Sequence, residues 1–292
     1  MTSTQSQPLR AALWMIGAIV SFTSMAVAGR SLASELDTFE IMLYRSLIGV
    51  GIVLIAGGMA GTLAQINRTS FGLHLVRNIS HFIGQNLWFF ALTVIPLAQV
   101  FALEFTSPIW AIFLAVIVLG EKLTKTRLLT AALGFVGILI ITRPWATSLS
   151  PGVIAAALAA IGFAGSAVFT RLLTRTQTIT CILFWLTAMQ SVFGLVTAGY
   201  DGDIAVPSSS SIPWIILISV AGLVAHFSLT KALSLAPAAI VMPVDFTRLP
   251  VIVIVGILLY NEPLESVVII GAIIIFAANY LNILSETRKN RA

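Results

Sequence analysis

An acid and a base that could bind a small polar molecule stand inside long apolar stretches of this sequence. Glu104 lies in the middle of ALTVIPLAQVFALEFTSPIW, residues 91–110. Asp245 and Arg248 are three residues apart, which places two side chains on one face of a helix. Such a pair could neutralise itself, or it could bind the ammonium and the carboxylate of a zwitterion. Both interpretations stay open from the residues alone.

A second group of polar residues recurs at helical spacing. Arg77, His81, Gln85 and Trp88 follow one another at intervals of four, four and three residues, so they share one helix face. His226 lies in a separate apolar stretch. A buried histidine is more often a structural hydrogen-bonding residue than a proton carrier, yet imidazole titrates near neutral pH. The sequence therefore leaves both a structural role and proton coupling open for the two histidines.

These polar residues are rare in a chain that is too apolar for a water-soluble protein. Of its 292 residues, 58% are hydrophobic and 9% are charged, and the mean hydropathy is +1.02. Soluble domains carry about 25% charged residues. The long Leu-, Ile-, Val- and Ala-rich runs lack the alternation of an outer-membrane barrel. The predicted fold class is therefore an all-α integral membrane protein.

Ten apolar stretches approach or exceed the ~20 residues that a membrane-spanning helix needs. They are residues 9–32, 37–57, 72–94, 97–119, 125–143, 151–173, 179–199, 212–233, 238–260 and 264–284. A charge at the centre of such a helix costs about 2.5–3.5 kcal/mol on insertion scales and usually faces a cavity or a partner. We therefore expect Glu104, Asp245 and Arg248 to face a central polar cavity.

The basic residues predict the orientation of the chain. With the N-terminus in the cytoplasm, twelve of the sixteen Lys and Arg residues fall on the cytoplasmic side, as the positive-inside rule requires. They are Arg10, Arg68, Arg77, Lys122, Lys125, Arg127, Arg171, Arg175, Lys231, Arg288, Lys289 and Arg291. This explains the net charge of +5 without a nucleic-acid partner. We expect a multi-pass protein of the bacterial inner membrane, embedded in the lipid bilayer, with both termini cytoplasmic.

The two halves of the chain are related by a shift of 141 residues. The shift lays the stretch 91–110 onto ALSLAPAAIVMPVDFTRLPV, residues 232–251, so that Glu104 meets Asp245. The neighbouring residues Phe105 and Phe246 also coincide. The recurrence of a carboxylate at one helix position in both halves argues against a stray charge.

Each half would hold five helices, and an odd number inserts the two halves in opposite directions. Inverted repeats with a site at their interface are typical of secondary transporters. We therefore predict ten transmembrane helices, built as two inverted five-helix repeats around a central cavity. The predicted repeats are residues 1–145 and 146–292.

Four prolines are predicted to act as hinges. Pro96 and Pro237 lie in short turns that join the third span to the fourth and the eighth to the ninth. Pro108 and Pro250 interrupt the fourth and ninth spans near their centres. Proline removes a helical hydrogen bond and kinks the helix. We expect the two hairpins to move about these positions.

The stretches FFALTVIPLAQVFALEFTSPIWAIFLAVIVLGEKLT (89–124) and KALSLAPAAIVMPVDFTRLPVIVIVGILLYNEPLE (231–265) share a pattern. Each has a proline after a short turn, then a helix, then Gly-Glu or Asn-Glu at its end. In this pattern the chain resembles the drug/metabolite transporter superfamily, EamA type, and within it the bacterial exporters of amino acids, including aromatic ones. The resemblance implies a central cavity lined by the third, fourth, eighth and ninth spans, with the first and sixth.

The predicted substrate-binding residues are the polar and aromatic side chains expected at the depth of this cavity. They are His81, Gln85, Trp88, Glu104, Phe105, Trp110, His226, Asp245, Phe246 and Arg248. Arg77 and Lys231 lie nearer the cytoplasmic helix ends and are expected to extend towards the membrane surface. Arg45 is interpreted as structural, and Glu262 as a residue that fixes a turn.

The predicted function is secondary active export of small metabolites across the inner membrane by alternating access. Amino acids are favoured by the zwitterion argument, and aromatic ones by the resemblance. The alternatives are an uptake or exchange carrier for a nucleoside-like metabolite and a drug efflux carrier. The sequence contains no HExxH, GxSxG or P-loop motif and no His/Cys cluster, so we expect no enzyme, no cofactor and no metal site. A channel would not require the inverted duplication.

Overall fold

The structure is a computed structural model that describes residues 7–120, 124–145, 149–235 and 244–289. Within these ranges the chain is helical and contains no strand. The first half comprises α1 (Pro8–Leu32), α2 (Thr38–Met59), the 3₁₀ turn η1 (Leu63–Gln65), α3 (Phe71–Val94), α4 (Leu97–Glu104), α5 (Ser107–Leu119) and α6 (Lys125–Thr142). The second half comprises α7 (Pro151–Leu173), α8 (Ile179–Ala198), α9 (Ile212–Leu235), α11 (Arg248–Tyr260) and α12 (Ser266–Lys289).

The predicted all-α membrane fold is confirmed. Seven segments of the described residues are long and apolar enough to cross a membrane, and two shorter apolar helices, Arg248–Tyr260 and Ser266–Leu281, follow. The helix α3 is as long as the seven but is not among them, because many of its residues are polar. This polar helix forms the longest wall of the site described below.

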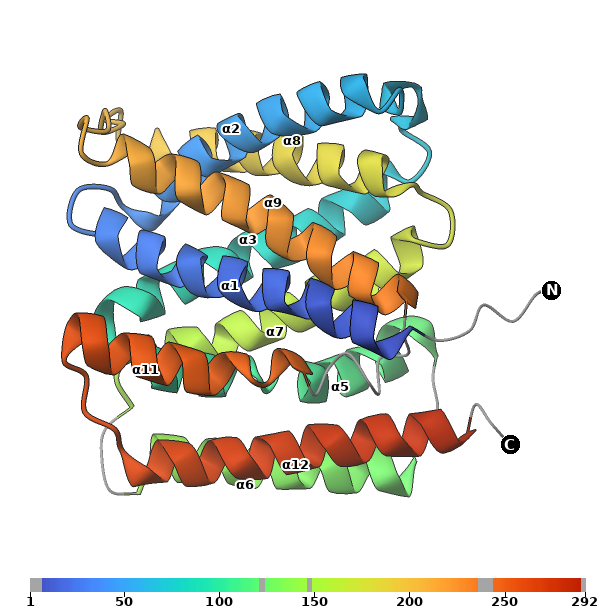
Figure 1. Ribbon diagram of the computed structural model, residues 1–292, viewed down its shortest axis with the longest axis vertical. Helices are drawn as coiled ribbons and strands as arrows, with labels where there is room; N and C mark the ends of the chain where they lie inside the picture. Colours follow the sequence, from blue (N-terminus) through green and yellow to red (C-terminus); the bar gives the residue numbers. More distant parts are fainter. Residues whose placement is uncertain (1–6, 121–123, 146–148, 236–243, 290–292) are drawn as a thin grey trace.

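The main helix contacts join the two halves of the chain. In the described part, α1 packs on α9, α3 on α7, α2 on α8 and α6 on α12, as can be followed in Figure 1. The first helix of each half therefore packs against the third helix of the other, while the second helices and the fifth helices pair with each other. A pseudo-two-fold axis between inverted repeats produces this exchange.

Small residues allow the paired helices to approach closely. A Cβ atom added to Gly162 of α7 would lie 2.8 Å from the Cα of Gly84 on α3. A Cβ atom added to Gly137 of α6 would lie 2.9 Å from the carbonyl oxygen of Gly271 on α12. Backbones come this close in membrane helices where the interface lacks side chains. Glycine pairs therefore fix two of the interfaces between the halves.

The fourth predicted span is a broken helix. Its first part, α4, ends at Glu104, and α5 begins at Ser107, with a turn at Phe105 and Thr106. Asn279 of α12 donates from Nδ2 to the carbonyl oxygen of Phe105 at 2.8 Å, which satisfies a backbone group freed by the break. Pro108 lies in the first turn of α5, where a missing N–H costs no helical hydrogen bond.

The ninth predicted span breaks at the equivalent place. Asp245 is helical, Phe246 and Thr247 form a turn, and α11 begins at Arg248. Pro250 is the third residue of α11. The interruptions that the sequence predicted are present, but the chain turns just before each proline. Pro237 lies outside the described residues.

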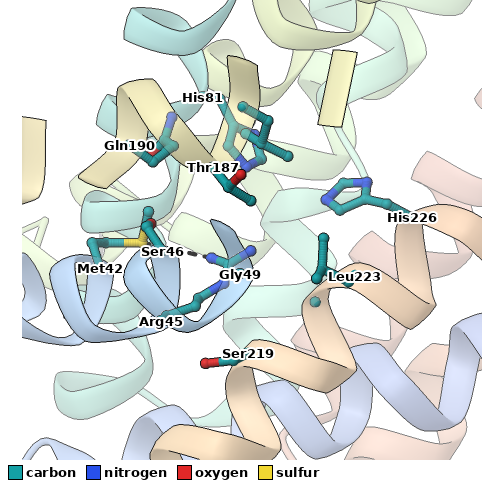
Figure 2. Close-up of a pocket in the computed structure, with 12 residues that line it drawn as sticks. Met42, Arg45, Ser46, Gly49, His81, Thr187, Gln190, Ser219, Leu223 and His226 are labelled. Carbon is teal, nitrogen blue, oxygen red and sulfur yellow. Dashed lines mark hydrogen bonds between the residues drawn. The ribbon is translucent and has the colours of Figure 1, made fainter. Parts of the chain in front are cut away.

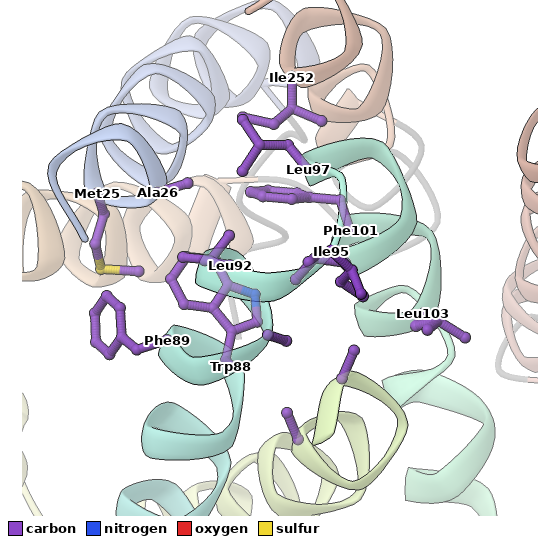
Figure 3. Close-up of a cluster of buried hydrophobic side chains, with 14 of the residues drawn as sticks. Met25, Ala26, Trp88, Phe89, Leu92, Ile95, Leu97, Phe101, Leu103 and Ile252 are labelled. Carbon is purple, nitrogen blue, oxygen red and sulfur yellow. The ribbon is translucent and has the colours of Figure 1, made fainter. Parts of the chain in front are cut away.

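A dense apolar cluster closes one end of the bundle where α3 turns into α4. Trp88, Phe89 and Leu92 of α3 belong to this cluster with Leu97 and Phe101 of α4. Figure 3 shows the Phe101 ring beside Leu97 and the Phe89 ring beside Met25 of α1. The Trp88 ring lies 5.8 Å from the ring of Phe101 in an edge-on arrangement. Pro96 precedes α4 directly, so the turn between the two helices is only two residues long.

Candidate functional site

A cavity of about 520 Å³ lies in the middle of the bundle. Its walls come from α1, α3, α4, α5, α7, α9 and α11, together with the turn before α11. These are the six spans that the family resemblance implied. The volume is within the range of about 300–1,000 Å³ that is usual for small-molecule sites.

Nine of the ten predicted substrate-binding residues line this cavity. They are His81, Gln85, Trp88, Glu104, Phe105, His226, Asp245, Phe246 and Arg248. Trp110 does not line it. The Trp110 ring packs on Phe135 of α6, with 5.1 Å between the ring centroids. Ser107 and Ala111 present the cavity face of α5, and Trp110 lies on a different face of that helix.

Arg248 joins the two repeated carboxylates. Its Nη2 lies 3.0 Å from Oε1 of Glu104 and 3.5 Å from Oδ2 of Asp245. The other oxygen of Glu104 accepts a hydrogen bond from the indole N–H of Trp88 at 2.8 Å. Charge-assisted hydrogen bonds of this kind are about twice as strong as neutral ones. Glu104 therefore faces a polar partner in the cavity, as the sequence predicted.

Aromatic rings enclose the Arg248 guanidinium. Its central carbon lies 4.6 Å from the ring centre of Phe22, 5.1 Å from that of Phe101 and 5.0 Å from that of Phe105. Cations within about 6 Å of a ring face are attracted to it. Arg248 thus has two carboxylates and three rings as partners before any substrate is bound.

The α3 side of the cavity differs, because its arginine has only neutral partners. Arg77 is buried, donates from Nε to the hydroxyl of Thr170 at 3.1 Å, and donates from Nη1 to the side-chain oxygen of Asn78 at 2.8 Å. The prediction that Arg77 extends towards the membrane surface is therefore wrong: its side chain turns inward onto α7. Arg77 lines the same cavity as Arg248.

A small side pocket of about 20 Å³ lies behind the two histidines, large enough for one water molecule. His81 and His226 line both the pocket and the main cavity, and their ring centres are 5.8 Å apart. Figure 2 shows Arg45 of α2 entering the pocket from the opposite wall. Arg45 donates a hydrogen bond to Oε1 of Gln85, so it contacts a cavity residue from behind.

The end of the bundle beyond Trp88 is closed by an ion pair between the halves. Arg30 of α1 pairs with Glu262, which follows α11. Arg30 also donates to the carbonyl oxygens of Leu92 at 2.5 Å and Ile95 at 2.6 Å, and Glu262 accepts from the N–H of Leu97 at 2.8 Å. Glu262 therefore does more than fix its own turn. It ties the α3–α4 hairpin to α1 and to the end of α11.

Several lining residues were not predicted from the sequence to face the cavity. Phe22 of α1 and Ser166 and Thr170 of α7 line the cavity. An aromatic or small hydroxyl residue in an apolar helix gives no signal of the side it faces. The sequence pointed to these residues only indirectly, because the family resemblance implied that the first and sixth spans line the cavity.

A helical membrane bundle of two inverted halves, with a polar cavity and one closed end, defines a membrane transporter. The sequence profile of the EamA-like transporter family matches residues 9–143 and again residues 150–284, so the chain belongs to that family. The resemblance to the EamA type, noted from the two proline-containing stretches, is confirmed, whereas the resemblance to amino-acid exporters within it is not.

Relatives of known name are also transporters. The chain is 38% identical over 194 residues to a riboflavin transporter of Brucella anthropi, covering 65% of this chain and 68% of that one. It is 28% identical over 294 residues to a riboflavin transporter of Vibrio cholerae, covering 99% and 98%. It is 24% identical over 275 residues to an S-adenosylmethionine uptake transporter of Rickettsia conorii, covering 94% and 92%.

A solved crystal structure has the same fold. It superposes with a TM-score of 0.65 at 17% identity and covers 94% of this chain and 97% of that one. The similarity extends over nearly the whole chain, so both halves and their relative placement belong to a known architecture.

Proposed function

We propose that the protein is a secondary carrier that takes up or exchanges a flavin-like or nucleoside-like metabolite by alternating access. The observation that carries the proposal is the cavity of about 520 Å³, which combines aromatic rings with polar groups and is closed at one end. The names of the riboflavin and S-adenosylmethionine transporters support this substrate class. Of the alternatives open from the sequence, uptake of a nucleoside-like metabolite is thus favoured over amino-acid export.

The aromatic lining supports a substrate with a flat ring. Trp88, Phe105, Phe163 and Phe246 contribute rings to the cavity wall. Such rings bind planar ligands by offset or edge-on contacts at little entropic cost. Phe105 and Phe246 meet edge-on with their centres 5.3 Å apart, directly beside the break in each half.

The state of Arg248 argues against the amino-acid alternative. An amino-acid carboxylate would have to compete with Glu104 and Asp245, which already hold the guanidinium. The zwitterion interpretation of the Asp245–Arg248 pair is weaker for that reason. An amino acid is nevertheless included among the compounds tested below, so that this alternative is tested as well.

In this mechanism the closed end, held by Arg30 and Glu262, acts as a gate that must open for the substrate to pass. Opening that end requires Arg30 to leave Glu262 and the carbonyls of Leu92 and Ile95. We place this end at the periplasmic side of the inner membrane, in keeping with cytoplasmic termini and the positive-inside rule. Proton coupling through His81 and His226 stays a prediction, to be tested with an imposed pH gradient.

Counterflow in proteoliposomes tests the proposal. Vesicles are loaded with unlabelled riboflavin, S-adenosylmethionine, adenosine or phenylalanine, and entry of the same labelled compound is measured. We expect saturable counterflow for riboflavin or a nucleoside-like compound. The Trp110→Phe protein is the control, because that ring lies off the cavity. Counterflow of phenylalanine alone would restore the amino-acid carrier, and counterflow of none of the four would reject the proposed class.

A cross-link tests the gate. Cysteines replacing Arg30 and Glu262, in a protein whose Cys181 is changed to alanine, bridge the closed end with a short bifunctional reagent. We expect cross-linking to abolish flux and reduction of a cleavable linker to restore it. Unchanged flux in the cross-linked protein would show that the closed end need not open.

A further inference from the structure

Three arginines are buried near the cavity in the described part of the chain, and only one of them has an acidic partner. Arg248 pairs with Glu104 and Asp245. Arg45 and Arg77 have no carboxylate within 4.0 Å among the described residues. Their partners are an amide, a thioether, a hydroxyl and a second amide. The α2–α3 side of the cavity is therefore the side on which positive charge is not balanced.

Some of the N–H donors of Arg77 are not used within the described part of the protein and are available to the cavity. A guanidinium has five N–H donors in a fixed fork. Within the described residues, Nε of Arg77 donates to Thr170 and Nη1 donates to Asn78, while Nη2 makes no hydrogen bond. Thr170 and Arg77 both line the cavity, so the unused nitrogen belongs to a side chain at the cavity wall.

Arg45 adds a second positive charge behind this wall and holds Gln85 in place. Its guanidinium packs against Gly222 of α9, where an added Cβ would lie 2.8 Å from Nη2, so any larger residue would displace it. The arginine donates to the carbonyl oxygen of the Gln85 side chain. The amide nitrogen of Gln85 makes no hydrogen bond among the described residues and is left for the cavity.

A buried cation without an anionic partner is destabilising unless water supplies hydrogen-bond acceptors or a ligand supplies the counter-charge. Among the described ionisable groups that line the cavity and its side pocket, three arginines stand against two carboxylates, which gives 3 − 2 = +1 with neutral histidines. Both carboxylates are engaged by Arg248. The unbalanced charge therefore lies at Arg77 and Arg45, on the opposite wall.

We propose that the substrate carries an anionic oxygen group, a carboxylate or a phosphate, and that Arg77 binds it. This deepens the proposed function and rests on it, because it adds the charge to a substrate class defined by flat rings. Arg77 and Gln85 lie eight residues apart, about 12 Å along α3. The anionic group then lies towards the end of the cavity away from the Arg30–Glu262 pair, and the ring lies nearer Trp88.

The test uses pairs of compounds that differ by one acidic group. The pairs are flavin mononucleotide with riboflavin, S-adenosylmethionine with its decarboxylated form, and phenylalanine with phenethylamine. Binding to the purified full chain is measured by the shift of its thermal unfolding, and transport is measured by counterflow. We expect the acidic member of the recognised pair to bind at least tenfold more tightly. The ratio of the two affinities, acidic member to acid-free member, should fall to near one in Arg77→Gln. In Arg77→Lys part of this preference should remain.

Arg10→Gln is the matched control, since it removes an exposed arginine on α1 and should leave the ratio unchanged. A ratio, unlike activity alone, does not move when a variant merely lowers the amount of folded protein. If the acid-free member binds as tightly as the acidic one, or if Arg77→Gln leaves the ratio unchanged, the proposal is overturned while the transporter assignment stands. If only the phenylalanine pair binds, the proposed substrate class fails. The affinities of phenylalanine and phenethylamine then still test whether Arg77 binds an acidic group. Binding of no pair by a folded protein overturns both.

Discussion

The two halves of the chain place equivalent carboxylates in unequal surroundings. Glu104 of the first half uses both oxygens, one towards Arg248 at 3.0 Å and one towards Trp88 at 2.8 Å. Asp245 of the second half reaches Arg248 at 3.5 Å with one oxygen, and its Oδ1 has no hydrogen-bond partner among the described residues. The same position in the two repeats is therefore tightly held in one and loosely held in the other.

The difference arises because the two halves share their helix arrangement but carry different polar side chains at equivalent positions. The residue that the 141-residue shift lays onto Arg248 is Ser107, and the residue that it lays onto His81 is Gly222. One arginine therefore serves two carboxylates. Symmetric packing builds a cavity between the halves, while unequal side chains give that cavity a carboxylate-rich wall and an arginine-rich wall.

Removing Arg248 should have the largest effect. Arg248→Met leaves Glu104 and Asp245 buried beside each other, and breaking a buried ion pair on one side costs about 3–5 kcal/mol. We expect a large loss of folded protein, measured as the thermal unfolding midpoint in detergent. The triple variant with Glu104→Gln and Asp245→Asn should recover most of the stability. An Arg248→Met protein as stable as the parent would show that Arg248 is not needed to neutralise Glu104 and Asp245.

Neutralising the two carboxylates one at a time should give unequal results. Glu104→Gln weakens two short hydrogen bonds, and bonds to a charged group contribute about 1.5–3 kcal/mol each. Asp245→Asn weakens one bond at 3.5 Å. We therefore expect Glu104→Gln to lower the unfolding midpoint more than Asp245→Asn. Equal losses, or the reverse order, would mean that the repeats contribute equivalent carboxylates after all.

The helix interfaces offer a matched comparison between the halves. Gly162 and Gly84 meet between α7 and α3, whereas the equivalent positions on α1 and α9 are Ser21 and Ala225. Gly162→Ser copies the residue of the other half into an interface with no room, where overpacking costs about 1–3 kcal/mol. We expect a lower unfolding midpoint.

Gly51→Ala serves as the control for that substitution. An added Cβ at Gly51 meets nothing within 4 Å, so alanine should be neutral or stabilising by up to about 1 kcal/mol. If Gly162→Ser and Gly51→Ala have equal unfolding midpoints, the close contact between α3 and α7 does not limit what the interface accepts.

The features that could be predicted from the sequence are those set by periodic patterns. Long apolar runs predicted the spans, and the coincidence of Glu104 with Asp245 predicted a shared cavity. The direction in which a side chain faces is set by packing against distant helices. The helical spacing placed Arg77 on the same face as His81, but its depth led to the wrong expectation that it extends to the membrane surface. Depth along a span also gave no means of telling that Trp110 faces α6. The break before Pro108 was misplaced by a few residues, because a proline fits the first turn of the following helix better than the bend itself.

The smallest effect should come from a contact outside the spans for which the two halves use different residues. Glu35, in the turn after α1, accepts hydrogen bonds from Ser211 and Ser208 of the turn before α9, which lowers the pKa of its carboxyl below 4.5. The equivalent residue in the second half is Thr176, and there the neighbouring Gln177 donates to the hydroxyls of Thr69 and Ser70 in the turn before α3. Since the folded-state pKa is depressed, the contact stabilises the protein above about pH 4.5 and is lost as the pH falls through the lowered value. In Glu35→Gln we expect a small drop in the unfolding midpoint at pH 7, measured against the parent protein, and this drop should shrink as the pH is lowered below 4.5. A drop that keeps its size as the pH is lowered would show that the charge of Glu35 does not hold the two turns together.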